Sequence, residues 1–192
     1  MKSKTGIIIL LIATLILTLA GCGGQGDCLS KFEKSDMSGY DGLEGYEEEL
    51  QFVDVTVKDI QAMMEAKETF AVFAGFSNCI WCNLMVSSLN DEAIKAGRLV
   101  GYLNTRAKPE WSNNLDIDDY DIFVEYFGDY LSIDDAGKPH LYTPDVYFVK
   151  NGVVVERHDG IVPGVDNPKD PLTEAQKKAL ADVYAQCFSA ME

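Results

Sequence analysis

The feature that most constrains the fold of this chain is residues 70–85, FAVFAGFSNCIWCNLM. Its first part is an apolar run of the kind that forms a strand buried on both faces. Apolar residues then recur at three- and four-residue spacing up to about residue 96, which predicts a helix that ends at Gly97. Cys79 and Cys82 lie where the strand gives way to the helix. We therefore expect a strand that leads directly into a helix with two cysteines near its start.

The position of these cysteines favours thiol chemistry. The first turn of a helix carries unpaired backbone N–H groups and a partial positive charge, so a thiolate at Cys79 is stabilised and its pKa falls below the ordinary value. Cys82 lies within one turn, on the apolar side of the helix, which suits a resolving thiol beneath a nucleophile. Two alternatives stay open at this point. They are a pair of inert core cysteines, and a zinc or copper site completed by ligands from among His140, His158, Cys28 and Cys187.

The other patterns along the chain predict an α/β domain over residues 51–192. Short β-branched or apolar runs predict strands at about residues 52–57, 69–76 and 98–104. An amphipathic pattern predicts a helix between the first two of these strands. Asn151-Gly152 is a strong signal for a hairpin of two further strands. Thr173 and Gln176 form a capping box before a last helix that has one apolar stripe.

Residues 105–141 are predicted to be an insertion that carries one or two helices. Pro109 and the sequence SNN mark a loop, and residues 116–128, DIDDYDIFVEYFG, have the acidic first turn and the terminal glycine of a helix. The acidic residues of this helix do not have the spacing of a calcium loop, so we interpret them as a solvated face.

The first 21 residues are predicted to be a lipoprotein signal peptide. Lys2 and Lys4 precede an apolar run over residues 6–20, which is shorter than the roughly 20 residues that cross a bilayer. The run ends in LAGC, residues 19–22, which resembles the lipobox of bacterial lipoproteins, where the cysteine is lipidated and becomes the mature N-terminus. Cys22 is therefore the predicted lipidation site. An uncleaved anchor or an ordinary signal peptide are the alternatives, and each places the folded part outside the cytoplasm.

Residues 22–50 are predicted to be a flexible acidic tether. The sequences GGQG and SGYDGLEGYEEEL are rich in glycine and acidic residues and have little periodicity. Leu43, Tyr46 and Leu50 are the positions through which part of this segment could pack on the domain.

The charge balance of the chain limits its partners. The 192 residues include 16 Lys and Arg against 31 Asp and Glu, a formal net charge of −15. Such acidity argues against nucleic acid as a partner and against electrostatic attraction to anionic lipid. An acyl chain on Cys22 is then the expected membrane anchor, on the extracytoplasmic face of a bacterial cell membrane.

The remaining cysteines have two interpretations. The chain has five cysteines, so four are left if Cys22 carries lipid, and an extracytoplasmic location permits disulfides. Cys187 lies on the apolar stripe of the last helix, where a cysteine can be a small core residue. A disulfide between Cys28 and Cys187, which would attach the tether to the last helix, is the other expectation.

The order of strand, C-x-x-C and helix, followed by Thr143-Pro144 directly before a hairpin and a last helix, resembles the thioredoxin superfamily over residues 52–190. The resemblance implies a thioredoxin-like fold, with a central mixed β-sheet flanked by helices and a helical insertion before a cis-proline at Pro144. The exported tether and the sequence FSNCIWC are most similar to thioredoxin-like lipoproteins of Gram-positive bacteria, which include the bacteriocin-transport accessory proteins.

The resemblance implies a function and a set of site residues. It implies thiol–disulfide exchange on exported proteins, as a reductase or an isomerase, with Cys79 attacking and Cys82 resolving. The backbone of Thr143 would pair with substrate, Pro144 would keep metal from the thiols, and Trp81 would present an apolar surface to a peptide. The Cys79–Cys82 disulfide is then the redox group, without a cofactor or metal. The partners would be thiols and disulfides of exported proteins and an electron donor or acceptor in the membrane or outside the cell.

The sequence also departs from the thioredoxin pattern. Phe73 stands where thioredoxin has a buried acid that helps to move the proton of the second cysteine, and Asn78 stands where a Trp is usual. The residues between the cysteines are Ile80 and Trp81 instead of Gly-Pro. These departures leave the direction and rate of electron flow open. A non-catalytic thioredoxin-fold accessory to an export or transport system and a copper or zinc carrier are the alternative functions.

Overall fold

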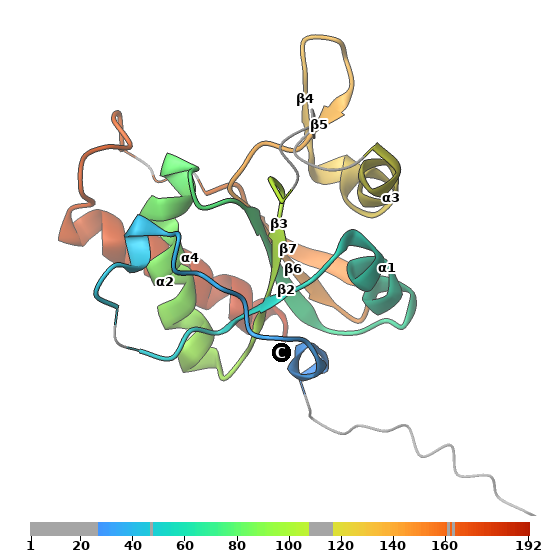
Figure 1. Ribbon diagram of the computed structural model, residues 1–192, viewed down its shortest axis with the longest axis horizontal. Coiled ribbons are helices and arrows are strands. Elements are labelled where there is room, and N and C mark those ends of the chain that lie inside the picture. The colour runs from blue at the N-terminus through green and yellow to red at the C-terminus, as the bar shows by residue number, and fades with distance from the viewer. Residues whose placement is uncertain (1–26, 47, 108–116, 161, 163) are drawn as a thin grey trace, which may run out of the picture.

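The computed structural model describes residues 27–46, 48–107, 117–160, 162 and 164–192, and these form an α/β fold around a central sheet (Figure 1). The strands are β1 (Phe52–Asp54), β2 (Phe70–Gly75), β3 (Val100–Asn104), β4 (Ser132–Ile133), β5 (Pro139–His140), β6 (Asp145–Lys150) and β7 (Val153–His158). The helices are α1 (Val57–Glu65), α2 (Ile80–Ala96), α3 (Ile117–Phe127) and α4 (Glu174–Ala190). Short 3-10 turns are η1 (Cys28–Lys31), η2 (Asp41–Leu43) and η3 (Gly128–Tyr130).

The main sheet is mixed and has five strands in the order β1-β3-β2-β6-β7. Strand β3 runs parallel to β1 and β2, while β6 runs antiparallel to β2 and β7. All six residues of β2 are buried, because helices cover both faces of the parallel part. The predicted class, an α/β protein with a mixed sheet flanked by helices, is confirmed.

Two hydrophobic cores lie on the two faces of this sheet. Helices α2 and α4 pack against each other on one face, and α1 and α3 pack together on the other (Figure 1). Successive residues of β2 point to opposite faces, so Phe73 enters the core under α2 while Val72 enters the core under α1. The double-sided apolar run of the sequence is therefore divided between two cores.

Local signals set the ends of several elements as predicted. Thr173 Oγ1 accepts the Gln176 N–H at 3.3 Å and Gln176 Oε1 accepts the Thr173 N–H at 2.9 Å, which is the predicted capping box of α4. Gly97, at the end of α2, has φ of 62° in the left-handed region. Asn151 also has positive φ, at 52°, in the turn between β6 and β7.

The N-terminal strap, as we call residues 27–46, packs on the domain and is not a flexible tether. Leu43, Tyr46 and Leu50 do pack on the core, as the sequence allowed. Leu29 is buried in the core under α1, whereas Tyr40 is buried in the core under α2. Between them the strap pairs with the edge strand β1 through an antiparallel bridge from Lys34 to Val53. Its buried residues are spaced irregularly, and so periodicity does not reveal them.

The predicted signal peptide and the lipidation site Cys22 lie outside the described residues. Within the described ranges, none of the helices has the length and apolar character needed to span a membrane.

The insertion contains the predicted helix, α3, followed by η3 and a small hairpin. Phe123 and Phe127 of α3 pack against Tyr147 of β6 with ring centroids 5.8 and 4.4 Å away. Strands β4 and β5 form a separate antiparallel pair that projects away from the main sheet (Figure 1). The sequence predicted only a turn in this region, because a strand of two residues is too short to show alternation.

Candidate functional site

The two cysteines lie where β2 leads into α2, as the sequence predicted. A tight turn follows Gly75, in which the Cys79 N–H donates to the Phe76 carbonyl at 3.0 Å. Cys79 is the N-cap residue of α2, with extended backbone, and its Sγ accepts the Cys82 N–H at 3.3 Å. The sulfur thus takes the role that a serine or aspartate oxygen has at other helix N-termini.

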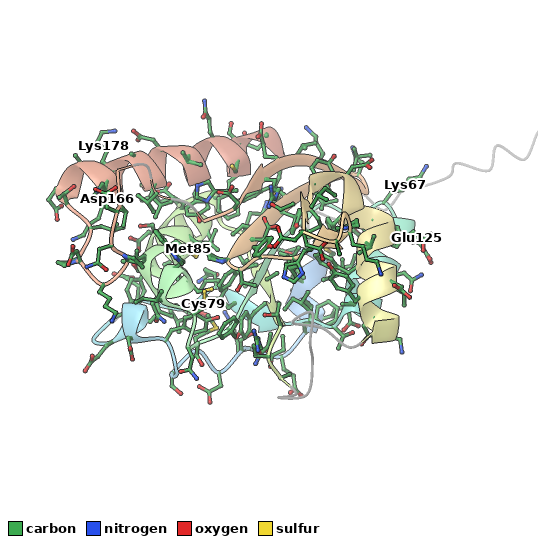
Figure 2. The ribbon with its side chains drawn as sticks, turned by 90° about the horizontal axis from the view of Figure 1, so that it is seen from above. Lys67, Cys79, Met85, Glu125, Asp166 and Lys178 are labelled. Carbon is green, nitrogen blue, oxygen red and sulfur yellow. The ribbon has the colours of Figure 1, made fainter. Side chains whose placement is uncertain are left out.

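Cys82 lies beneath Cys79 in the core and is fully buried. A Cβ built on Gly75 would be 3.1 Å from Cys82 Sγ and 2.5 Å from Cζ of the Phe73 ring. The second thiol therefore rests directly over the backbone of β2, where a side chain would collide with it. Cys79 itself is buried, with 7% of its surface exposed, whereas Lys178 of α4 lies on the outer surface (Figure 2).

Thr143 and Pro144 bring a distant loop to the first cysteine. The Thr143-Pro144 peptide bond is cis, as the resemblance implied. The Cys79 thiol donates to the Thr143 carbonyl at 3.6 Å, and Thr143 Oγ1 donates to Cys79 Sγ at 3.8 Å. Gly160 packs against the proline ring, since a Cβ there would lie 2.1 Å from Pro144 Cγ. The segment just after β7 thus supports the loop that faces the thiols.

The surroundings of the two sulfurs move their pKa values apart. Hydrogen bonds from the Cys82 thiol, the Cys82 N–H and the Thr143 hydroxyl outweigh burial and lower the pKa of Cys79 to about 6. Burial raises the pKa of Cys82, and its hydrogen bond to the Cys79 sulfur raises it further. At neutral pH the pair therefore holds one thiolate at Cys79 and one protonated thiol at Cys82.

Several aromatic rings belong to the same core as the second cysteine. The Phe73 ring centroid lies 6.1 Å from that of Tyr40 and 5.7 Å from that of Tyr102. The two tyrosine hydroxyls are hydrogen-bonded at 3.1 Å in the interior. This apolar environment disfavours a charged Cys82 until the state of Cys79 changes.

The three predicted substrate-binding residues line one pocket next to Cys79. Trp81, Thr143 and Pro144 share this pocket, of about 470 Å³, with Ser132, Tyr142, Arg157, Asp159 and Gly160. Tyr142 is 55% exposed and Trp81 is half-buried, so both can present aromatic surface to a ligand. Sequence reasoning missed Tyr142, although its position directly before Thr143-Pro144 was a usable signal.

A buried ion pair supports this pocket and had no local signal in the sequence. Asp145, which follows Pro144, is fully buried and accepts from Arg157 Nε at 2.8 Å and Nη2 at 2.9 Å. The Tyr147 hydroxyl donates to the same carboxylate at 2.6 Å. Burial raises the pKa of Asp145 to about 6 despite these bonds. The pair joins β6 to β7 behind the cis-proline.

The predicted disulfide between Cys28 and Cys187 is not formed, because the sheet separates the two residues. Cys28 contacts Met63 Sδ and the Thr69 carbonyl, both at 3.7 Å, on the α1 side. Cys187 is buried in the core under α2 and α4 on the other face. All four cysteines among the described residues are free thiols.

The histidines considered as metal ligands have other contacts. The ring of His140 packs on Tyr142, and His158 Nδ1 lies 3.1 Å from the Tyr184 hydroxyl. Across the part of the chain that the structure describes, His, Cys, Asp and Glu form no group of three placed to hold a metal ion.

No known protein-family model matches this chain, and no curated protein matches its sequence. The fold and the site together define a class: an α/β protein with a C-x-x-C pair at a helix N-terminus, opposite a cis-proline.

Proposed function

We propose that this protein is an extracytoplasmic thiol–disulfide oxidoreductase of thioredoxin-like fold, acting as a reductase or isomerase on exported proteins. One observation carries the proposal: Cys79 Sγ accepts from the Cys82 N–H at 3.3 Å and from the Thr143 hydroxyl at 3.8 Å, with the second thiol buried beneath it. This arrangement lowers the pKa of one thiol and keeps the other protonated in reserve.

The thioredoxin-like fold is supported by the connections around the site. The C-x-x-C pair follows the central strand β2, and the cis-proline precedes β6, the strand that pairs with β2. A hairpin and a last helix follow, as in that superfamily. The signal-peptide pattern and Cys22 support the extracytoplasmic, lipid-anchored location.

The first step is attack by Cys79 on a substrate disulfide. The thiolate forms a bond to one substrate sulfur, the substrate S–S bond breaks, and the other sulfur leaves as a thiolate that takes a proton from water. A pKa of about 6 makes thiolate the main form of Cys79 at neutral pH. The product is a mixed disulfide between Cys79 and the substrate.

The second step is release by Cys82. Once Cys79 is in the mixed disulfide it no longer carries charge, so the repulsion that opposes ionisation of Cys82 disappears. Cys82 loses its proton, its sulfur attacks Cys79 Sγ and the mixed disulfide breaks; the second substrate sulfur leaves as a thiolate and takes up that proton. Two electrons pass to the substrate and the Cys79–Cys82 disulfide forms. A dithiol donor is then needed to reduce the Cys79–Cys82 disulfide. In isomerisation, a different thiolate of the substrate attacks the mixed disulfide instead, which forms a new substrate disulfide and releases Cys79 as a thiolate.

Substrate binding is assigned to the pocket beside Cys79. Tyr142 and Trp81 offer apolar surface to side chains of an unfolded or extended segment, and the backbone of Thr143 lies within reach of Cys79. A peptide bound there would bring its cysteine to Cys79, the less buried of the two thiols.

The test is trapping of mixed disulfides in cells. In a Cys82→Ser variant the resolving thiol is absent, so adducts through Cys79 should accumulate and be seen as higher-mass bands on non-reducing gels. Cys79→Ser is the matched control, and it should trap nothing. If neither variant forms adducts, disulfide exchange is contradicted and a non-catalytic binding accessory is favoured. Stoichiometric copper or zinc in protein purified without reductant would instead favour a metal carrier.

A further inference from the structure

We propose that Asn83 is a positioning residue for the thiol pair, through which the N-terminal strap holds the loop that carries Cys79. This inference rests on the proposed thiol chemistry and gives the strap a part in it. Asn83 directly follows Cys82, in the first turn of α2.

The Asn83 carboxamide bonds to three backbone groups, two in the loop before α2 and one in the strap. Its Nδ2 donates to the Ser77 carbonyl at 2.6 Å and to the Cys79 carbonyl at 3.1 Å. Its Oδ1 accepts the Gly42 N–H of the strap at 2.9 Å. One side chain thus connects the loop before the first cysteine to the strap.

The strap also packs directly on this part of the molecule. A Cβ on Gly42 would lie 2.0 Å from the Asn83 carbonyl oxygen, so the two backbones touch. A Cβ on Gly39 would lie 3.1 Å from the side chain of Ser77. Between these glycines, Tyr40 is buried against Phe73 and donates its hydroxyl to Tyr102. Residues 39–42 therefore form one wall of the loop that ends at Cys79.

The carbonyl contacts matter because they fix the backbone of Cys79. That residue has φ of −80° and ψ of 112°, the extended conformation that turns an N-cap side chain back onto the helix. The Cys79 carbonyl also accepts the Asn83 backbone N–H at 3.1 Å, so removal of the side chain leaves it this one donor, while the Ser77 carbonyl loses the Asn83 Nδ2 donor. The loop before Cys79 can then move, and Sγ is no longer held 3.3 Å from the Cys82 N–H. The thiolate then loses stabilisation, and the pKa of Cys79 moves toward its ordinary value.

Helix α2 supplies a matched control in Asn90, about two turns further on. Asn90 is fully buried, and its Oδ1 accepts the Gln51 N–H at 2.7 Å. Its Nδ2 donates to the Tyr46 hydroxyl at 3.1 Å and the Glu49 carbonyl at 3.3 Å. Asn90 thus ties neighbouring N-terminal residues to the same helix, but within the described ranges it makes no hydrogen bond to the loop before Cys79.

The experiment follows the alkylation of Cys79 by iodoacetamide against pH, in reduced full-length protein, with the modified residue identified by mass spectrometry. In the wild type, half of the maximal rate is expected near pH 6. Asn83→Ala should raise this midpoint by about one pH unit, which is about a tenfold loss of rate at low pH. Asn90→Ala should lower stability but leave the midpoint unchanged.

The outcomes separate this inference from the proposed function. A midpoint of Cys79 alkylation near pH 6 in all three proteins, or equal shifts of the midpoint in both variants, overturns the role of Asn83. Either result still agrees with a Cys79 thiol of lowered pKa. A wild-type midpoint near 9 contradicts the activated thiol, and the inference falls with it. If Asn83→Ala does not fold, Gly42→Ala replaces it in the experiment. Its added methyl group pushes the strap off α2 while the Asn83 side chain is kept. An unshifted midpoint in Gly42→Ala overturns the proposal.

Discussion

At the scale of single residues, the site is defined by two cysteines in unlike surroundings. Cys79 is surrounded by donors from the helix N-terminus and from Thr143, whereas Cys82 lies among aromatic rings. The same residue type therefore has opposite pKa shifts three positions apart. This asymmetry supports the proposal that Cys79 attacks and Cys82 resolves.

The depressed pKa of Cys79 predicts a pH-dependent stability of the reduced protein. Because the pKa is about 6 when folded and 9.0 for the ordinary thiol, the folded state binds fewer protons between these values. The free energy of unfolding of reduced wild type, relative to Cys79→Ser, should rise with pH across this window by up to roughly 1.4 kcal/mol per pH unit. The stability that Cys79 ionisation contributes should be lost as pH falls through 6.

Urea unfolding in the presence of reductant, at several pH values, measures this difference. The pKa of Cys82 is raised, so its opposing effect begins only above the ordinary thiol value. Parallel stability curves for the two proteins would contradict the depressed pKa of Cys79.

At the scale of elements, the junction of β2 and α2 depends on a residue without a side chain. Strand β2 ends at Gly75, and both Phe73 and Cys82 occupy the space where a Cβ would be. Helix α2 can begin this close to β2 only because Gly75 has no side chain. The spacing between the sheet and the thiols is set at that position.

Gly75→Ala is therefore expected to destabilise the protein by about 1–3 kcal/mol through overpacking. Gly128→Ala is the matched control, since its Cβ would meet only Val124 Cγ1 at 3.2 Å, and its effect should be smaller. Free energies of unfolding from urea titration distinguish the two. Equal effects would show that the close contact beneath Cys82 is not what makes Gly75 necessary.

At the scale of the whole molecule, the strap connects the two cores. It enters the core under α1 at Leu29, passes the edge strand β1, and reaches the core under α2 at Tyr40 (Figure 1). Asp27 secures its start, because its carboxylate accepts the Leu99 N–H at 2.7 Å. The strap is thus part of the folded unit, and its residues 39–42 lie beside the thiol site.

Leu29→Ala tests this organisation. Leu29 is fully buried, so its truncation should lower the free energy of unfolding by about 2–5 kcal/mol. Ser30→Ala changes an exposed neighbour in the same turn and should have an effect of less than about 0.5 kcal/mol. Chemical denaturation measures the free energy of unfolding of both variants. An unchanged value for Leu29→Ala would show that this segment is a flexible tether after all.

The sequence by itself determined the features that depend on short-range physics. The buried strand, the helix with Cys79 at its start, the turn at Asn151-Gly152 and the Thr173 capping box all follow from periodicity, turn chemistry and helix capping. The cis bond before Pro144 was expected from resemblance alone.

Only the tertiary structure decided what packs against these elements. Thr143 meets Cys79 across 64 positions of the chain, and the strap closes on Asn83 with buried residues that follow no period. Cys28 and Cys187 are separated because successive layers of the fold place them on opposite faces of one sheet. Such contacts depend on which surfaces meet once all elements have formed, and no local pattern encodes that choice.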